Sequence, residues 1–347
     1  MEFTYQSVHN HFVVRFKKEP LLVRSPGRIN LIGEHTDYNS GLVMPAAVDK
    51  ENIFAIAPSN NHTSKIFALN FNAVFEIDRQ NPQSVSTPAW ANYVLGIVRQ
   101  LVDLGHALKP FTCVFGGNIP SGSGLASSAA LACGFAFALR ELNSLHLSRT
   151  EIVKIGLWSE HNYVGVRCGI MDQFANMMGK ENHVIQLDCR SLEYQYLPID
   201  QSAHSIVLFN SGVKHSLAST EYNARRAECE EGVQILKSKK ASITSLRDIS
   251  IQELEESRSL LPENIYARCM YIVQEIQRVQ HAGADLLRGD LQSFGKRMFE
   301  THDGLSKSYK VSCEELDYLV SLVKNNTEIL GARMMGGGFV AGARLIS

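Results

Sequence analysis

The sequence predicts an α+β protein, and three features of its patterning support that class. Short β-type runs, punctuated by Gly, Pro and Asn, fill the first part of the chain. Segments with apolar residues at helical spacing then intervene between further β-type runs. After Glu221 the pattern becomes mostly helical, before a strand-like ending after Leu330. The chain is therefore mixed, with strands concentrated early and helices late.

The individual elements follow from these local patterns. Early strands are expected in "LLVRS", "GLVMPAAV", "NIFAIA" and "KIFALNF". Helices are expected over residues 89–104, 125–142 and 148–164. Later strands are expected in "HVIQLD", "YQYLPI" and "SIVLFN". Because no Pro/Ser-rich linker or repeat is visible, we place the domain boundary at a compact hinge after Pro198, which gives domains of residues 1–198 and 199–347.

The composition excludes several functional classes. The chain has 347 residues, is 45% hydrophobic and has a formal net charge of -1, which is typical of a soluble protein with a sizeable core. With 34 Lys+Arg against 35 Asp+Glu, no excess of positive charge is available to bind nucleic acid or anionic lipid. No apolar segment is long enough for an export signal or a membrane span. The 7 cysteines are scattered without a C-x-x-C pair, so we expect a cytoplasmic protein without disulfides or structural zinc. A monomer is expected separately, and no residue pattern fixes the oligomeric state.

A glycine-rich stretch, "GGNIPSGSGLASSAAL" at residues 116–131, joins a β-type run to an Ala- and Leu-rich helix. A helix N-terminus presents unpaired N–H groups and a positive dipole end, and glycines let a phosphate approach the backbone closely. The stretch lacks the Lys of a G-x-x-x-x-G-K-[ST] loop, and Ser127 stands where a dinucleotide-binding G-x-G-x-x-G motif needs its third Gly. Two interpretations stay open: a phosphate-binding loop, or a tight turn before a core helix.

Two further stretches concentrate charged side chains where an ordinary surface loop would not need them. "SPGRINLIGEHTDYNSGLVMPAAV" places Arg28, Glu34, His35 and Asp37 in a glycine-punctuated segment between β-type runs. "CGIMDQFANMMGK" places Asp172 in an apolar setting, where an isolated carboxylate is costly unless it is paired or functional. Taken singly, Asp172 could instead cap a helix, and Arg28 with Glu34 could form a solvated ion pair.

Five stretches, in order along almost the whole chain, resemble the galactokinase family of the GHMP kinases. "GRINLIGEHTDYNSGLVMPAA" resembles the galactokinase signature, and "PSGSGLASSAAL" resembles the phosphate loop that the superfamily shares. "VKHSLASTEYNARR" and "SYKVSCEELD" resemble further galactokinase segments, and "GARMMGGGF" resembles the glycine-rich third motif. The resemblance implies a two-lobed GHMP kinase fold, with a mixed α/β N-terminal lobe, a ferredoxin-like α+β C-terminal lobe and the active site in the cleft.

The resemblance also implies roles for the residues that match. Asp172 matches the general base that acts on the anomeric hydroxyl, and Arg28 matches the cation beside it that stabilises the transferring phosphoryl group. Carboxylates suit sugar recognition, because each oxygen can accept more than one hydrogen bond from a polyol. The residues that match those receiving sugar hydroxyls are Glu34, His35, Asp37 and Tyr222.

For ATP, the matching residues of the phosphate loop are Gly122, Ser123, Gly124, Leu125, Ala126, Ser127 and Ser128. Ala126 replaces a serine that is frequent in the family, which removes one hydroxyl contact. Ser128 and Glu160 match the residues that hold Mg²⁺, a hard ion that keeps some of its water and takes few protein oxygens. For Glu160, an exposed carboxylate on a helix remains the alternative.

The implied activity is ATP-dependent phosphorylation of D-galactose at the anomeric hydroxyl to α-D-galactose 1-phosphate, the first committed step of galactose metabolism. Two alternatives stay open: a kinase for another galactose-configured sugar, and a non-catalytic sugar sensor on the same fold. The intact phosphate loop and the presence of Asp172 favour catalysis. After "GGGF" the family continues with a further strand and helix, so we expect the C-terminal lobe, which ends at Ser347, to lack both.

Overall fold

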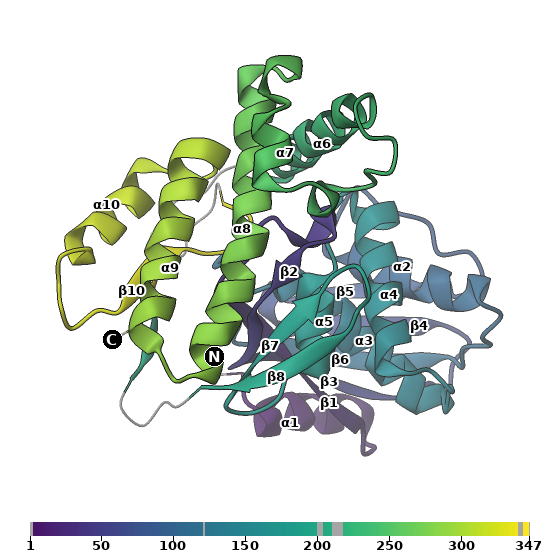
Figure 1. The fold of residues 1–347 in the computed structure, drawn as a ribbon. Coiled ribbons are helices and arrows are strands. Elements are labelled where there is room, and N and C mark those ends of the chain that lie inside the picture. The colour runs from purple at the N-terminus through teal and green to yellow at the C-terminus, as the bar shows by residue number, and fades with distance from the viewer. Residues whose placement is uncertain (1–2, 121, 200–203, 210–217, 339–342, 347) are drawn as a thin grey trace. The chain divides into compact units, whose positions relative to one another are not determined.

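The computed structural model describes residues 3–120, 122–199, 204–209, 218–338 and 343–346 of the chain (Figure 1). The chain divides into two compact units. The first unit comprises residues 1–28, 47–121 and 125–178, and the second comprises residues 29–46, 122–124 and 179–347. Both units are therefore assembled from segments that are far apart in the sequence.

The first unit is built on one five-stranded mixed sheet with the strand order β1-β3-β6-β4-β5. Its strands are β1 (Leu21–Asn30), β3 (Pro45–Pro58), β4 (Ser64–Ala68), β5 (Ala73–Ile77) and β6 (Phe111–Gly117). The central strand β6 is buried along its whole length and pairs antiparallel with β3 and parallel with β4. Because successive side chains of a strand point to opposite faces, this sheet has two apolar faces to cover.

Helices of the first unit cover both faces of this sheet. They are α1 (Tyr5–Phe16), α2 (Ala91–Asp103), α3 (Ser127–Asn143), α4 (Arg149–Ser159) and α5 (Met171–Met178). On one face, Phe12 of α1 belongs to a buried cluster that includes Ile53 of β3. On the other face, Phe135 of α3 contacts Phe54. Gly134 permits this approach, because a Cβ there would lie 2.5 Å from the Phe54 ring.

The second unit contains two small sheets. The first is antiparallel, has β7 in its centre, and consists of β2 (Leu42–Val43), β7 (His183–Asp188) and β8 (Tyr194–Pro198). The second is antiparallel, has β11 in its centre, and consists of β9 (Ile206–Phe209), β10 (Gly331–Met334) and β11 (Ala343–Ile346).

The helices of the second unit are α6 (Ala218–Lys237), α7 (Ile251–Glu255), α8 (Glu263–Leu287), α9 (Leu291–Gly304) and α10 (Glu314–Val323). The long helix α8 packs against α6, α7 and α9 (Figure 1). Its residues Tyr271 and Ile272 are buried in a hydrophobic core cluster of this unit. A π-helical turn after α9 brings Tyr309 into the same core. None of the helices in the described part of the chain has the length and apolar character of a membrane span.

The predicted α+β class is confirmed, and most predicted elements lie where the local patterns place them. The run "HVIQLD" forms β7 with the expected bounds. The helix expected over residues 148–164 is interrupted, because α4 ends at Ser159 and a π-helical turn over Glu160–Val164 follows. Apolar spacing continues through this region and does not distinguish the two helix types.

Two expectations about the second unit require correction. The division of the chain differs from the boundary expected after Pro198, because β2 pairs with β7 and therefore groups residues 29–46 with the segment that follows residue 178. The expected loss of the closing strand does not hold either. Residues 343–346 form β11, which pairs with both β10 and β9 and so fills the central position of its sheet.

Candidate active site

The first unit brings the predicted base and the predicted cation together. Arg28 lies in β1, and Asp172 lies in the first turn of α5. The guanidinium of Arg28 donates from Nε to Oδ1 of Asp172 at 2.7 Å and from Nη2 to Oδ2 at 2.8 Å. This is the bidentate geometry that makes arginine–carboxylate pairs strong and directional. Because Arg28 and Glu34 are both buried, the interpretation as a solvated ion pair is wrong.

Exposure distinguishes the two partners of this pair. The side chain of Arg28 is 5% exposed, whereas that of Asp172 is 25% exposed. A carboxylate oxygen has two lone pairs, so an oxygen that accepts one hydrogen bond from arginine can accept another. Asp172 is thus oriented by Arg28 and still accessible to a ligand.

The glycine loop before α3 has a backbone that only small residues adopt readily. Gly122 and Gly124 have φ values of 72° and 71°, in the left-handed region that favours glycine. Ala126, the N-cap residue of α3, also has a positive φ of 56° and provides no side-chain cap, and the first turn of α3 contains no acidic residue. A helix N-terminus of this kind is suited to an anion.

Glu160 is buried, so the alternative of an exposed helix carboxylate is wrong. Its Oε2 accepts a hydrogen bond from Sγ of Cys168 at 2.9 Å. Its Oε1 is buried without a hydrogen-bond partner among the described residues. Burial raises the pKa of Glu160 to about 7, and the charge of Asp172 acts in the same direction. The hydrogen bond from Cys168 opposes this increase, and the nearby Ser128 hydroxyl does so to a smaller extent.

Ser128 and Glu160 fit a magnesium site as a pair of oxygen donors. The Ser128 hydroxyl lies near enough to Glu160 to lower the pKa of the carboxyl. Mg²⁺ usually takes one or two protein carboxylates or hydroxyls and completes its shell with water and phosphate oxygens. Within the described residues, no three His, Cys, Asp or Glu side chains gather in a way that could hold a metal ion. The buried, unpartnered Oε1 of Glu160 is the observation that favours a cation here.

In the second unit, three hydrogen bonds orient the carboxylate of Glu34. Nη2 of Arg333 and the backbone N–H of Gly336 donate to Oε1 at 2.9 and 2.8 Å. Nδ2 of Asn30 donates to Oε2 at 2.8 Å. Glu34 is 1% exposed and Arg333 is 0% exposed. The first motif and the glycine-rich third motif therefore meet at this carboxylate.

His35 is buried in the second unit and lies among tyrosines, of which Tyr309 is buried and Tyr38 is partly buried. Nδ1 of His35 is 2.8 Å from the Tyr38 hydroxyl, which is 2.7 Å from the Tyr309 hydroxyl. Burial lowers the pKa of His35 to about 4, so the ring is neutral at pH 7. Its Nε2 is buried and makes no hydrogen bond of standard geometry with the described residues, although the backbone of Gly337 lies near enough to the ring to raise its pKa. A neutral imidazole nitrogen of this kind can hydrogen-bond a hydroxyl as donor or as acceptor, according to its tautomer.

Asp37 and Tyr222 complete the set of residues predicted to receive sugar hydroxyls. Asp37 begins a 3₁₀ turn, is 8% exposed, and accepts a hydrogen bond at Oδ1 from the backbone N–H of Tyr38 at 3.0 Å. Tyr222 lies in α6, and its ring centroid is 5.3 Å from that of His35 and 5.5 Å from that of Tyr38. All four of the predicted sugar residues belong to the second unit, whereas Arg28 belongs to the first.

Sequence reasoning missed the residues that hold these side chains in place, which are Asn30, Tyr38, Tyr309 and Arg333. Arg333 had a detectable signal, because it is a single charged residue in the fully buried strand β10. Tyr38 lies inside the galactokinase-like signature. No local pattern links Tyr309 with His35, because the two residues are far apart in the sequence.

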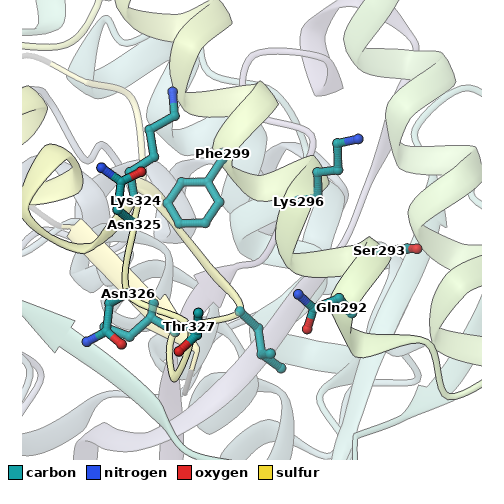
Figure 2. Close-up of a pocket in the computed structure, with 10 residues that line it drawn as sticks. Gln292, Ser293, Lys296, Phe299, Lys324, Asn325, Asn326 and Thr327 are labelled. Carbon is teal, nitrogen blue, oxygen red and sulfur yellow. The ribbon is translucent and has the colours of Figure 1, made fainter.

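A cavity of about 360 Å³ lies elsewhere in the second unit, between α9 and the segment after α10 (Figure 2). Phe299 forms part of its wall, and Lys296 and Lys324 lie at its rim (Figure 2). None of the predicted site residues lines it, and its lining contains no carboxylate and no histidine. It therefore offers no carboxylate or imidazole to act as the base for a hydroxyl nucleophile.

Comparisons with known proteins cover most of the chain. Residues 10–58 match the galactokinase galactose-binding signature. Residues 92–180 match the GHMP kinases N terminal domain, and residues 284–339 match the GHMP kinases C terminal domain. The segments matched include both members of the Arg28–Asp172 pair.

Whole-chain relatives agree with these matches. The galactokinase of Thermotoga neapolitana is 39% identical over 94% of this chain and 89% of its own length. The galactokinase of Chloroflexus aurantiacus is 38% identical over 92% of this chain and 81% of its own length. The structure of Lactococcus lactis galactokinase complexed with galactose matches with a TM-score of 0.95 at 33% identity, over 98% of this chain and 89% of that one. Mevalonate kinase from Methanococcus jannaschii, with a TM-score of 0.64 and 16% identity over 95% of this chain and 90% of its own, shares the fold.

Proposed function

Because this chain belongs to the galactokinase family and is a sugar kinase that phosphorylates galactose, we propose that it transfers the γ-phosphoryl group of ATP to the anomeric hydroxyl of D-galactose. The product is α-D-galactose 1-phosphate. A sugar hydroxyl is a weak nucleophile, so the transfer requires in-line positioning of the hydroxyl and neutralisation of the charge that develops on the phosphoryl oxygens.

The bidentate pair of Arg28 and Asp172 is the observation that carries the proposed mechanism. Asp172 accepts the proton of the anomeric hydroxyl, and its 25% exposure leaves room for that contact. Arg28 fixes the direction of the carboxylate and provides a positive charge next to the transferring group. The pair is a base with its cation, and no covalent intermediate on the protein is required.

The sugar is bound, in this proposal, by Glu34, His35, Asp37 and Tyr222. Glu34 and Asp37 are buried carboxylates that accept hydrogen bonds from hydroxyls. The unpartnered Nε2 of His35 gains a hydrogen bond when a sugar hydroxyl meets it. A hydroxyl of the wrong configuration leaves such a buried group unsatisfied, and this penalty favours galactose over its epimers.

The nucleotide phosphates are bound, in this proposal, by the backbone of residues 122–126 and by the N-terminal turn of α3, including Ser127. The uncapped helix N-terminus and the positive φ of Gly122 and Gly124 support this assignment. Ser128 and Glu160 would hold Mg²⁺, which when bound to the phosphates neutralises part of their charge.

We also place the enzyme in a reducing compartment such as the cytoplasm, acting as a monomer. All seven cysteines are free thiols, which supports a reducing environment.

A coupled kinase assay with ATP and Mg²⁺ over a panel of sugars tests the proposal. We expect phosphorylation of galactose and identify the product by the chemical shift of its anomeric phosphate. Phosphorylation at another hydroxyl would contradict the role given to Asp172. If the enzyme preferred a different galactose-configured sugar, that sugar would be assigned as the substrate instead. If it bound sugar without turnover, a non-catalytic sugar sensor would be favoured.

A further inference from the structure

Each of the three guanidinium nitrogens of Arg333 donates at least one hydrogen bond inside the protein. Its Nε donates to the carbonyl of Leu31 at 2.6 Å, and its Nη1 donates to the carbonyl of Met334 at 2.9 Å. Its Nη2 donates to the carbonyl of Asn30 and to Oε1 of Glu34. A planar guanidinium has several donors in a fixed geometry, so these contacts fix the orientation of the side chain. Arg333 therefore links the backbone just before Glu34 with the carboxylate of Glu34 itself.

The neighbours of Arg333 reinforce the same orientation. The N–H of Gly336 donates to the oxygen of Glu34 that also accepts from Arg333, and Asn30 donates to the other oxygen. The hydroxyl of Tyr271 donates to the backbone carbonyl of Glu34 at 3.1 Å. Both the backbone and the carboxylate of Glu34 are thus held in place without a ligand.

Stability alone does not account for this arrangement. Both partners of the Arg333–Glu34 ion pair are almost fully buried, with side-chain exposures of 0% and 2%. Removing two charges from water costs about as much as their attraction returns, so a buried ion pair is weak support for stability. A carboxylate that must present one fixed acceptor direction to a ligand does require such a partner.

We propose that Arg333 is a positioning residue that fixes the carboxylate of Glu34 for a galactose hydroxyl and thereby sets both sugar affinity and epimer discrimination. The proposal rests on the proposed function, because it assigns to Glu34 a contact with the sugar. Arg333 acts through Glu34 and does not touch the sugar itself.

The experiment compares Arg333→Lys and Arg333→Met with the parent enzyme, using galactose and glucose as substrates. Lys keeps the charge but loses the planar set of donors, and Met removes both. We expect the KM for galactose to rise by roughly 10-fold or more in Arg333→Met, the range for losing a hydrogen bond to a charged group. The KM for ATP and the kcat should change much less, and the galactose-to-glucose ratio of kcat/KM should fall. Lys should restore part of the affinity.

Arg297→Met is the matched control. Arg297 pairs with Asp285, a carboxylate in the same unit that is 1% exposed and also pairs with Arg288. We expect this variant to keep the parent KM for galactose and the parent epimer ratio.

A variant of Glu34 tests whether Arg333 acts through this carboxylate. In a Glu34→Gln background, Arg333→Lys should raise the KM for galactose no further, because the two residues act as one unit. If Arg333→Met fails to fold, the galactose KM and epimer ratio of Arg333→Lys test the proposal. A parent-like galactose KM and epimer ratio in Arg333→Lys would overturn the proposal, as would an equal rise in the KM values for galactose and ATP.

The same measurements separate this proposal from the proposed function. A parent that does not phosphorylate galactose contradicts the proposed function, and galactose-induced thermal stabilisation then still tests Arg333. Absence of any such stabilisation in the parent would overturn the positioning role as well. If the parent phosphorylates galactose and the Arg333 variants keep its galactose KM and epimer ratio, the positioning role is overturned and the proposed function stands.

Discussion

The transfer group in the first unit (Arg28, Ser128, Glu160 and Asp172) and the sugar group in the second unit (Glu34, His35, Asp37 and Tyr222) differ in how they hold their carboxylates. In the transfer group, Asp172 is a quarter exposed, and Glu160 has an unpartnered oxygen and a pKa raised to about 7. In the sugar group, Glu34 is buried and oriented by three donors, and His35 is held neutral by burial.

This difference fits what the proposed function requires of each group. Charge moves during phosphoryl transfer, so the transfer group needs side chains that can gain or lose a proton or bind a cation. Recognition of an epimer depends on acceptors and donors that do not move when the wrong hydroxyl arrives. The transfer group is therefore chemically responsive, and the sugar group is preorganised. Each of the following predictions tests one side of this contrast.

The largest effect is expected from Asp172→Asn. The amide keeps the size of the side chain but cannot accept the proton of the sugar hydroxyl, so kcat should fall by roughly 10²-fold or more. ATP binding should stay near the parent value, and steady-state kinetics with a direct nucleotide-binding measurement separate the two. Asp188→Asn is the matched control, because Asp188 forms a similar bidentate pair with Arg247 at 2.6 Å. Parent-like turnover in Asp172→Asn would remove this residue from the mechanism.

The second prediction concerns the preorganised side of the contrast. Each buried polar group left unsatisfied by a misplaced hydroxyl costs about 1–3 kcal/mol. The kcat/KM for galactose should therefore exceed that for glucose by roughly 10-fold or more, measured with both sugars at the same ATP concentration. Equal kcat/KM values for galactose and glucose would show that the sugar group does not distinguish the two epimers. The assignment of fold and family would not change.

The sequence predicts features that depend on neighbouring residues better than features that depend on contacts between residues far apart in the chain. Local spacing predicted strands such as β7, because alternation and turn residues act within a few positions. The resemblance pointed to Asp172, Arg28 and the four residues proposed to bind the sugar, and the structure pairs Arg28 with Asp172. It did not predict which unit each residue joins, because that depends on the pairing of Leu42 in β2 with the distant Asp188 in β7.

The supporting residues were beyond prediction for the same reason. Arg333 bonds Glu34 across a separation of 299 positions, and no local pattern specifies such a partner. The burial of Glu160 was not predictable from spacing, because helical periodicity does not show where an α-helix changes to a π-helical turn. The strand β11 was not expected, since its residues differ from the family's continuation after the third motif.

Glu160→Gln tests the responsive side of the contrast. The amide is neutral at every pH, so the Mg²⁺ concentration needed for half-maximal activity should rise by at least ~10-fold, the lower end of the loss seen even for outer-shell partners of a metal. In the parent, Mg²⁺ activation should weaken as the pH falls through about 7, because protonation removes the negative charge that binds the cation. In Glu160→Gln, this pH dependence should disappear. An unchanged Mg²⁺ requirement would exclude Glu160 as a ligand.

Stability without Mg²⁺ provides an independent measurement of the same group. The pKa of Glu160 in the folded protein, about 7, lies above its ordinary value of 4.5, so the folded state binds this proton more tightly than the unfolded state. The contribution to the free energy of unfolding is therefore complete below pH 4.5 and is lost as the pH rises toward 7. Chemical denaturation over this range should show a steeper loss in the parent than in Glu160→Gln. Identical slopes would mean that the carboxyl is not protonated at neutral pH.

The smallest effect is expected from Cys168→Ala, which changes the pKa of Glu160 but leaves the carboxyl in place. Sγ of Cys168 donates to Oε2 of Glu160 at 2.9 Å, and this hydrogen bond lowers the pKa of the carboxyl. Its loss should raise that pKa further, by less than about one pH unit, because a single neutral hydrogen bond contributes roughly 0.5–1.5 kcal/mol and one pH unit corresponds to about 1.4 kcal/mol. The midpoint of the pH dependence of Mg²⁺ activation should move upward by that amount. Cys313→Ala, which removes a thiol of the second unit, should leave the midpoint unchanged.

Galactose affinity and epimer preference should be the same in both variants, since the sugar group contains neither thiol. A change in epimer preference in Cys168→Ala would show that the two groups are coupled, and the contrast between a responsive and a preorganised set of residues would then have to be abandoned.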